Sequence, residues 1–247
     1  SLLFRHLIEG RRVEYDEALA QMAVLAGKLR SPRFDTALTQ NRAMTAAMDG
    51  RFAEAEELFF ESLGAARRMG NDVMVANTGV GLYQPWREQG RLGDLLDATR
   101  RVAEAPDALP SWRAGLIGLL AEVGRIDQAT EMLAAVDLVA VPDDVLRTYT
   151  LCVLAEGAVL VGDRERATLL RPLLDAAADV HVTIAGIAYW GTRSRYVGLI
   201  DHLLGDLDGA VALLRQAEDE HEVMRSPPWV ARTRYDLARV LIDRDAD

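Results

Sequence analysis

Gly50-Arg51-Phe52-Ala53-Glu54-Ala55 is the stretch that decides the fold, because variants of it recur along the chain. The other copies begin at Gly90, Gly124, Gly162 and Gly205. Each copy lies between two runs with helical spacing of apolar residues. Glycine adopts the left-handed conformation that ends a helix, and an acidic side chain after the turn favours the start of the next helix. The repeat therefore predicts helix–turn–helix units.

The spacing of these glycines indicates a repeat array. Successive copies are 40, 34, 38 and 43 residues apart, and tetratricopeptide repeats have a period of about 34 residues. We predict an all-α, tetratricopeptide-like solenoid of antiparallel helices, with about six helix pairs forming one domain over 1–247. The expected helices cover 1–9, 13–29, 33–49, 53–69, 73–89, 92–105, 111–123, 126–136, 143–161, 164–178, 184–204, 207–224 and 229–244.

Two segments depart from the regular pattern. The helix over 73–89 contains Gly79, Gly81 and Pro85, so we expect a kink or break at the proline. The glycine pair either allows a neighbouring helix or ligand to approach closely, or is a tolerated irregularity. Residues 179–183 are β-branched and short, and we expect a linker there.

The small residue five positions after each hinge glycine allows the second helix to approach the first. These alanines should therefore be buried at helix crossings, and replacing one with leucine should overpack the contact. The positions are Ala55, Ala129, Ala167 and Ala210.

Composition excludes several function classes. The chain of 247 residues has 50% apolar content and a formal net charge of −10, which argues against direct contact with nucleic acid. The single cysteine, Cys152, lies in an apolar run, so we expect a buried thiol in a cytoplasmic protein. No apolar run is long enough for a membrane span, and we see no signal peptide. The sequence begins within an expected helix and stops just after another, so we expect it to be a piece of a larger multidomain protein.

The sequence gives no positive evidence for an enzyme. A phosphate-binding lysine loop is absent, and 77–81 resembles a glycine fingerprint without its third glycine or preceding strand. The four histidines lie on different elements without metal-ligand spacing. We therefore expect no catalytic residues, no metal and no cofactor. An enzyme would need a closed pocket with clustered titratable groups. The nearest candidates for such a pocket are Gln84, Arg87, Glu88 and Glu122.

The first helix of each pair should line the inner, concave wall of such an array. The residues that this register places there are polar, with Met and Tyr among them, as suits a groove for a peptide, a partner helix or a small polar ligand. An ordinary solvated face has the same composition. The candidate binding residues are Gln40, Met44, Asn77, Gln84, Arg87, Glu88, Glu122, Tyr149, Glu156, Arg195, His202, Tyr235 and Arg239.

Two aromatic stretches stand out near the C-terminal end. Tyr189-Trp190-Gly191 falls at the start of the expected helix over 184–204, and Trp229 with Tyr235 falls in the last helix. Aromatic side chains anchor interfaces but also hold helix pairs together. We favour core packing for both stretches.

A family resemblance rests on three segments of the chain. Residues 189–199, 204–210 and 229–241 resemble the tetratricopeptide-like C-terminal regions of large actinobacterial ATP-binding LuxR-type transcriptional regulators and ATPase-linked adenylate cyclases. Residues 110–114 and 122–125 are similar to the same family's middle section. The resemblance implies a right-handed superhelix and a regulatory sensor arm. It carries over no catalytic residue, because the family's catalytic motifs are absent from this chain.

Three function hypotheses follow. The first is a non-catalytic sensor and interaction domain of a signalling protein, which binds a protein, a peptide or a small-molecule effector on its concave face. The second is a free-standing adaptor that binds one protein partner. The third, an enzyme built on a helical scaffold, is the least favoured. Neither the ligand nor the oligomeric state follows from the sequence.

Overall fold

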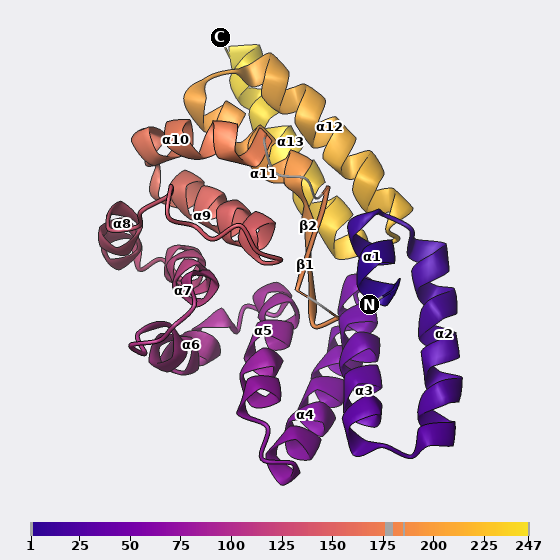
Figure 1. Cartoon of the computed structure of the whole chain (residues 1–247). Coiled ribbons are helices and arrows are strands. Elements are labelled where there is room, and N and C mark those ends of the chain that lie inside the picture. Colours follow the sequence, from indigo (N-terminus) through magenta and orange to yellow (C-terminus); the bar gives the residue numbers. More distant parts are fainter. Residues whose placement is uncertain (1, 176–179, 185, 247) are drawn as a thin grey trace.

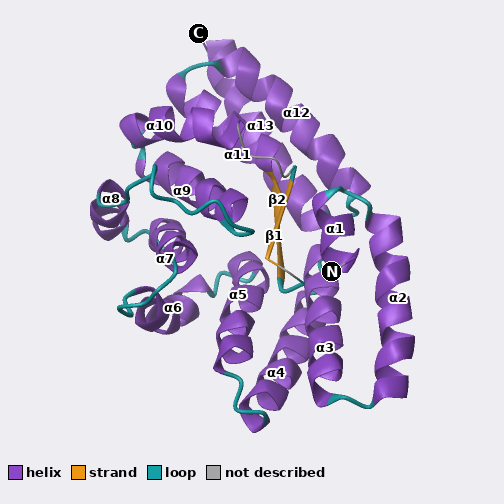
Figure 2. Ribbon diagram, in the orientation of Figure 1, coloured by secondary structure: helices purple, strands orange, loops and turns teal. Residues whose placement is uncertain are grey.

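A computed structural model describes residues 2–175, 180–184 and 186–246. Within these residues the chain is helical apart from one short β hairpin (Figures 1 and 2). The elements are α1 (Leu2–Ile8), α2 (Arg12–Leu29), α3 (Pro32–Met48), α4 (Phe52–Arg68), α5 (Asp72–Glu88), the 3-10 turn η1 (Leu92–Leu95), α6 (Leu96–Ala103), α7 (Pro110–Glu122), α8 (Ile126–Ala134), α9 (Arg147–Val161), α10 (Arg164–Asp175), β1 (His181–Ile184), β2 (Ala188–Thr192), α11 (Arg193–Leu204), α12 (Leu207–Val223) and α13 (Pro227–Ala246).

The hinge glycines end helices as the sequence predicts. Gly50 has φ of 80°, its N–H donates to the Ala47 carbonyl at 3.1 Å, and the Arg51 N–H donates to the Ala46 carbonyl at 2.8 Å. This pair of bonds is the Schellman arrangement, which satisfies carbonyls left free at a helix end. The same positive φ and the same pair of bonds recur at Gly10, Gly70, Gly90, Gly124, Gly162 and Gly205.

The four alanines that follow the hinges are buried at helix contacts, as predicted. None of them has any exposed surface, and each lies on a helix that packs against the preceding one. The thiol of Cys152 is also buried, as expected. The alanines are Ala55, Ala129, Ala167 and Ala210.

Helices that follow one another in the chain pack side by side, and together they curve around the hairpin (Figure 1). Helices α1, α3, α5, α9, α11 and α12 contact β1 or β2 and form a layer around the hairpin. Helix α7 packs on α9, and α9 packs on α11. The main hydrophobic core lies along this layer and includes Tyr189 and Trp190 of the hairpin.

The hairpin corrects the expected helix over 184–204. Ile184 ends β1, Tyr189 and Trp190 lie in β2, and α11 begins only at Arg193. Strand β2 is buried along its whole length, so its side chains fill the space inside the curve on both faces, which a helix of the same residues would not do. Of the expected linker 179–183, residue 179 lies outside the described residues, and 181–183 belong to β1.

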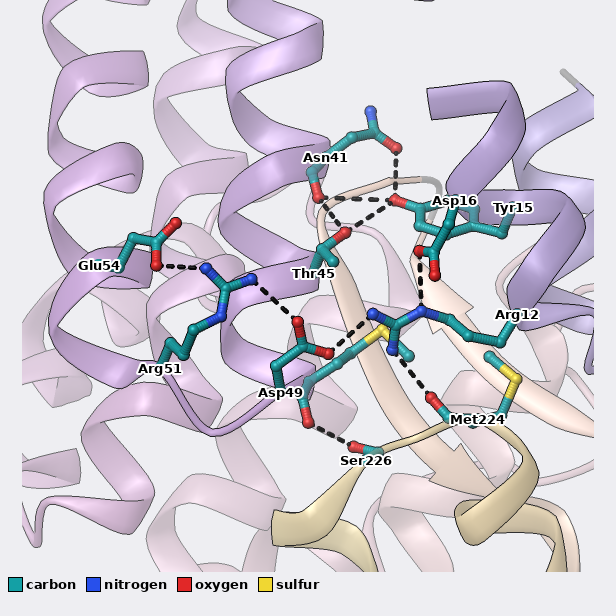
Figure 3. A network of polar contacts seen from close by, with 11 residues as sticks. Arg12, Tyr15, Asp16, Asn41, Thr45, Asp49, Arg51, Glu54, Met224 and Ser226 are labelled. Atoms are coloured by element: carbon teal, nitrogen blue, oxygen red, sulfur yellow. Dashed lines mark hydrogen bonds and ion pairs between the residues drawn. The ribbon is translucent and has the colours of Figure 1, made fainter. Parts of the chain in front are cut away.

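Contacts between distant parts of the sequence close the curve (Figure 3). The buried guanidinium of Arg12 on α2 donates to Asp49 Oδ1 at 2.7 Å and to the Met224 carbonyl at 2.9 Å. Ser226, just before α13, donates to the Met48 carbonyl at 2.9 Å. The turn before α13 is therefore held against the N-terminal helices.

Helix α5 continues through Pro85, which contradicts the expected break. Pro85 lies in the last turn, where a missing N–H removes a single ladder bond, and its carbonyl still accepts from Gln89 N–H at 3.2 Å. The two glycines of this helix differ. A Cβ on Gly81 would lie 2.2 Å from the Phe59 ring of α4, whereas one on Gly79 would meet nothing within 4 Å. Gly81 thus permits the close approach of a neighbouring helix.

The helices expected over 92–105 and 143–161 end or begin differently from their predicted bounds, and the one expected over 164–178 is described only in part. The segment 92–105 starts as a 3-10 turn and ends at Ala103, close to Pro106, because the residue before a proline is biased away from helix. The segment 143–161 becomes helical only at Arg147, since Asp144 Oδ1 accepts the Leu146 N–H at 2.9 Å and forms a turn there. For 164–178, α10 is described to Asp175, and 176–178 lie outside the described residues.

Candidate functional site

The inner-wall residues predicted from the sequence lie mostly inside the protein. Tyr235 and Arg239 on α13 are exposed, as is the last residue of α5, Glu88. The side chains of intermediate exposure are Asn77, Glu122 and His202. The expectation of a solvent-open concave wall is wrong for the buried positions, because the hairpin and α13 cover them. These are Gln40, Met44, Gln84, Arg87, Tyr149, Glu156 and Arg195.

Four of the predicted residues meet Asp236 in one largely buried ionic cluster. Arg195 on α11 donates to Glu156 Oε1 on α9 at 2.9 Å and to Asp236 Oδ2 on α13 at 2.8 Å. Arg87 on α5 donates to Glu122 Oε1 on α7 at 3.2 Å, and the same guanidinium lies 3.8 Å from Glu156 Oε2. One side chain from each of five helices is thus held in a continuous chain of charges.

Arg232 on α13 extends this chain. Its guanidinium donates to Glu88 Oε1 at 3.0 Å and lies 3.9 Å from Glu122 Oε1. We call the whole set the central ion-pair network. Its members are Arg87, Glu88, Glu122, Glu156, Arg195, Arg232 and Asp236.

Aromatic rings pack against the buried guanidinium groups. The Trp229 ring lies 5.0 Å from the guanidinium carbon of Arg87 and 5.6 Å from that of Arg195. Tyr83 and Tyr196 each flank one of these arginines, at 5.7 and 5.3 Å. Cation–π contact of this kind is strongest where water is excluded. The confirmed burial of Trp229 therefore serves the network, whereas Tyr235 is 65% exposed and does not take the expected core position.

The contacts within the network favour the ionised forms of Glu156 and Arg195. Burial alone would raise the pKa of the Glu156 carboxyl, but the guanidinium groups of Arg195 and Arg87 lower it to about 2. Burial would lower the pKa of Arg195, but the carboxylates of Asp236 and Glu156 raise it above its ordinary value. A general base works best with a pKa near the working pH. Glu156 does not meet that requirement, and its partners are already engaged.

The sequence analysis missed Arg232 and Asp236. They lie four residues apart on α13, and this spacing is equally typical of an exposed, solvated helix face. The only signal near them is Trp229, one turn earlier. Their partners lie on α5, α7 and α11, and only the folded position of α13 reveals them.

A cleft of about 550 Å³ opens between α6, α7, α8 and α9, on the other side of α7 and α9 from the network. Most of its lining is apolar. Its walls are the C-terminal end of α6, one face of α7, the end of α8, the α8–α9 loop and the first half of α9. The residues that line it are Ala103, Glu104, Ala108, Pro110, Arg113, Ala114, Ile117, Met132, Ala135, Val136, Asp137, Ala140, Val141, Thr150 and Leu154.

The loop that forms one wall of this cleft is fixed by side chains. Arg166 on α10 donates to the Val136 carbonyl at 2.8 Å, and Arg147 donates to the Val141 carbonyl. The Asp137 carboxylate accepts the N–H groups of residues 139 and 140 at 3.0 and 3.3 Å. This wall of the cleft is therefore held in place by the protein's own hydrogen bonds.

None of the predicted binding residues lines this cleft. The available signal was the pair of prolines, Pro106 and Pro110, which bracket the α6–α7 loop, with a second irregular stretch at 135–146. Long connections on one side of a helical array often carry binding sites. Nothing in the sequence, however, shows that the two loops face each other.

In the described part of the chain, no group of three or more His, Cys, Asp or Glu side chains is arranged to hold a metal ion. No described helix is both long enough and apolar enough to cross a bilayer. No protein-family model, curated protein or solved structure matches the chain.

Proposed function

We propose that the chain is a non-catalytic sensor and interaction domain of a cytoplasmic signalling protein. In this proposal its helices are tetratricopeptide-like antiparallel pairs in a right-handed solenoid of about six repeats. A small molecule enters the cleft between α6 and α9, and the resulting shift of α7 and α9 is read by a protein partner. The resemblance to LuxR-type regulators and ATPase-linked cyclases supports a parent protein of that class.

The observation that carries this proposal is that helices α7 and α9 each contribute side chains to both the cleft and the central ion-pair network. Helix α7 presents Ile117 to the cleft and Glu122 to the central ion-pair network. Helix α9 presents Leu154 to the cleft and Glu156 to the network. A ligand that separates or tightens these two helices changes the distances on which the buried charges depend.

The network then carries the change to α11 and α13. Charged partners in a buried site tolerate little displacement, because the desolvation cost is offset only at close range. A shift at Glu156 therefore acts on Arg195, which also holds Asp236 on α13. Helix α13 exposes Tyr235 and Arg239, two predicted binding residues, so a partner on this helix face would detect the change.

Native mass spectrometry of the chain purified gently from its own host tests the proposal. We expect a retained small mass that is lost in Ala140→Trp, which fills the cleft from its loop, and kept in Val145→Trp. Val145 is 72% exposed and lies outside the lining. Amide hydrogen exchange in α11 and α13 should be slower with the mass bound.

Two results would overturn this function. One is an apo mass in every preparation, with exchange unchanged by an extract of the host's small molecules. The other is a retained mass whose release alters exchange only at the cleft.

A free-standing adaptor is the second candidate, and exposed apolar side chains on α2 favour it. Val24, Leu25 and Leu29 are 61%, 56% and 56% exposed, and Phe34 at the start of α3 is 49% exposed. Apolar side chains that gather on a surface mark protein contacts. Cross-linking in host extract from a photo-reactive group at residue 25 should capture one protein in excess over a probe at residue 169, on α10. Equal capture at both positions would exclude an adaptor role for α2.

A further inference from the structure

We propose that the α6–α9 cleft binds a small carboxylic acid with an apolar body, and that Arg113 holds its carboxylate. This inference rests on the proposed sensor function and names the ligand class of the same cleft. It follows from three properties of the cleft: its apolar walls, an arginine whose guanidinium has no partner among the described residues, and its rigid loop.

The walls suit an apolar body. Ala114 and Ile117 lie one turn apart on α7, Leu154 faces the cleft from α9, and Met132 and Val136 close it from α8 and the loop. The volume of about 550 Å³ falls within the roughly 300–1,000 Å³ of small-molecule sites. Burying an apolar chain against these walls supplies the affinity.

The charges of the lining select an anion. Glu104 pairs with Arg100 at 2.9 Å, and the Asp137 carboxylate accepts two backbone N–H groups. Arg113 is exposed on α7 and has no ion pair or hydrogen bond within the described residues. Glu104 has its own ion-pair partner and Asp137 accepts bonds from its own loop, so Arg113 is the basic group of the lining left to a ligand, and its planar fork matches a carboxylate.

The fixed loop makes the contact specific. Arg166 and Arg147 hold the loop carbonyls from one side, and Asp137 holds its amides from within. A wall fixed in this way loses little conformational entropy when a ligand enters. The cleft should therefore discriminate between ligands of the same shape that differ only in their polar end.

Methyl NMR of the whole chain, titrated with sodium decanoate and with decan-1-ol, tests the inference. We expect decanoate to shift the methyl signals of Ile117 and Met132 and to leave that of Met48 on α3, which does not line the cleft, unchanged. We expect decanoate to bind about tenfold more tightly than the alcohol, since hydrogen bonds to charged groups are the stronger ones. Arg113→Gln should remove that preference and leave binding of the alcohol within twofold.

Two further variants complete the design. Arg101→Gln changes an exposed arginine of α6 outside the lining, and it should bind decanoate like the unchanged chain. Ala140→Trp should abolish binding of both probes. Folding of each variant is checked by the unchanged signals of the remote methyls.

The ligand class is overturned if the alcohol binds as tightly as decanoate or if Arg113→Gln leaves the preference intact. It is also overturned if neither probe shifts Ile117 and Met132. The sensor function fails separately, through an apo native mass together with exchange that the host's small molecules leave unchanged.

Discussion

Replacing Glu156 with glutamine removes the negative charge at the middle of the central ion-pair network. The side chain keeps its shape, but Arg195 at 2.9 Å and Arg87 at 3.8 Å lose their shared counter-ion. Both guanidinium groups are almost fully buried, so water does not replace the lost partner. Removing one partner of a buried pair typically destabilises a protein by about 3–5 kcal/mol.

The pKa of Glu156 gives an independent figure. It falls from an ordinary value of 4.5 to about 2, and each unit corresponds to about 1.4 kcal/mol, so the ionised form contributes about 3 kcal/mol. The folded pKa is the lower one, so this contribution is complete above pH 4.5 and is lost as the pH falls towards 2.

Urea unfolding of the unchanged chain and of Glu156→Gln measures the difference. We expect a gap of about 3 kcal/mol in the free energy of unfolding at pH 7, and a progressively smaller gap below pH 4.5. Glu54→Gln is the control, because its pair with Arg51 is half exposed, and exposed pairs contribute about 0–1 kcal/mol. A gap below 1 kcal/mol at pH 7, or one that does not change with acid, would refute the reasoning.

Four further substitutions test the packing and the helix ends by thermal or urea unfolding. Gly81→Ala should destabilise the chain by about 1–3 kcal/mol through its clash with Phe59. Gly79→Ala, with open space around it, should stabilise the chain by about 0.5–1 kcal/mol. Equal effects of the two substitutions would contradict the close contact between Gly81 and Phe59. Ala129→Leu should cost about 1–3 kcal/mol by overpacking, and an unchanged melting temperature would place the α7–α8 crossing elsewhere. Arg225, with φ of 50°, occupies the position that glycine takes at the other hinges, so Arg225→Gly should stabilise the chain by about 1 kcal/mol; a loss of stability would show that its side chain has a role.

The local parts of the fold follow from the sequence. A glycine in the left-handed conformation after a helix, followed by a small residue, is a short-range signal that needs no knowledge of the rest of the chain. Gly50 and Ala55 show this, since both the turn and the burial agree with the prediction. The predicted start of the helix over 184–204 was wrong, because Tyr189 and Trp190 suit the buried face of a helix as well as a strand. The better signal was the β-branched run 182–184 followed by Gly186, which has φ of 76°.

The candidate site could be predicted only in part, because it is built by contacts between residues that lie far apart in the sequence. The register correctly placed Arg87, Glu156 and Arg195 on the inner face, but the sequence does not show how tightly the helices curve. If the helices curved less tightly, these side chains would be free to contact a ligand. In the closed one, α13 supplies Asp236 and Arg232 as partners, 41 and 144 residues away from Arg195 and Glu88 respectively.

The Trp229 indole N–H signal, followed while decanoate fills the cleft, tests the central claim most directly. Trp229 packs on Arg87 and Arg195 and does not line the cleft, so its signal reports the state of the network. We expect it to shift with the same midpoint as the Ile117 methyl, and both responses to be lost in Ala140→Trp. A titration that moves Ile117 and leaves Trp229 unchanged would contradict coupling between the cleft and the central ion-pair network.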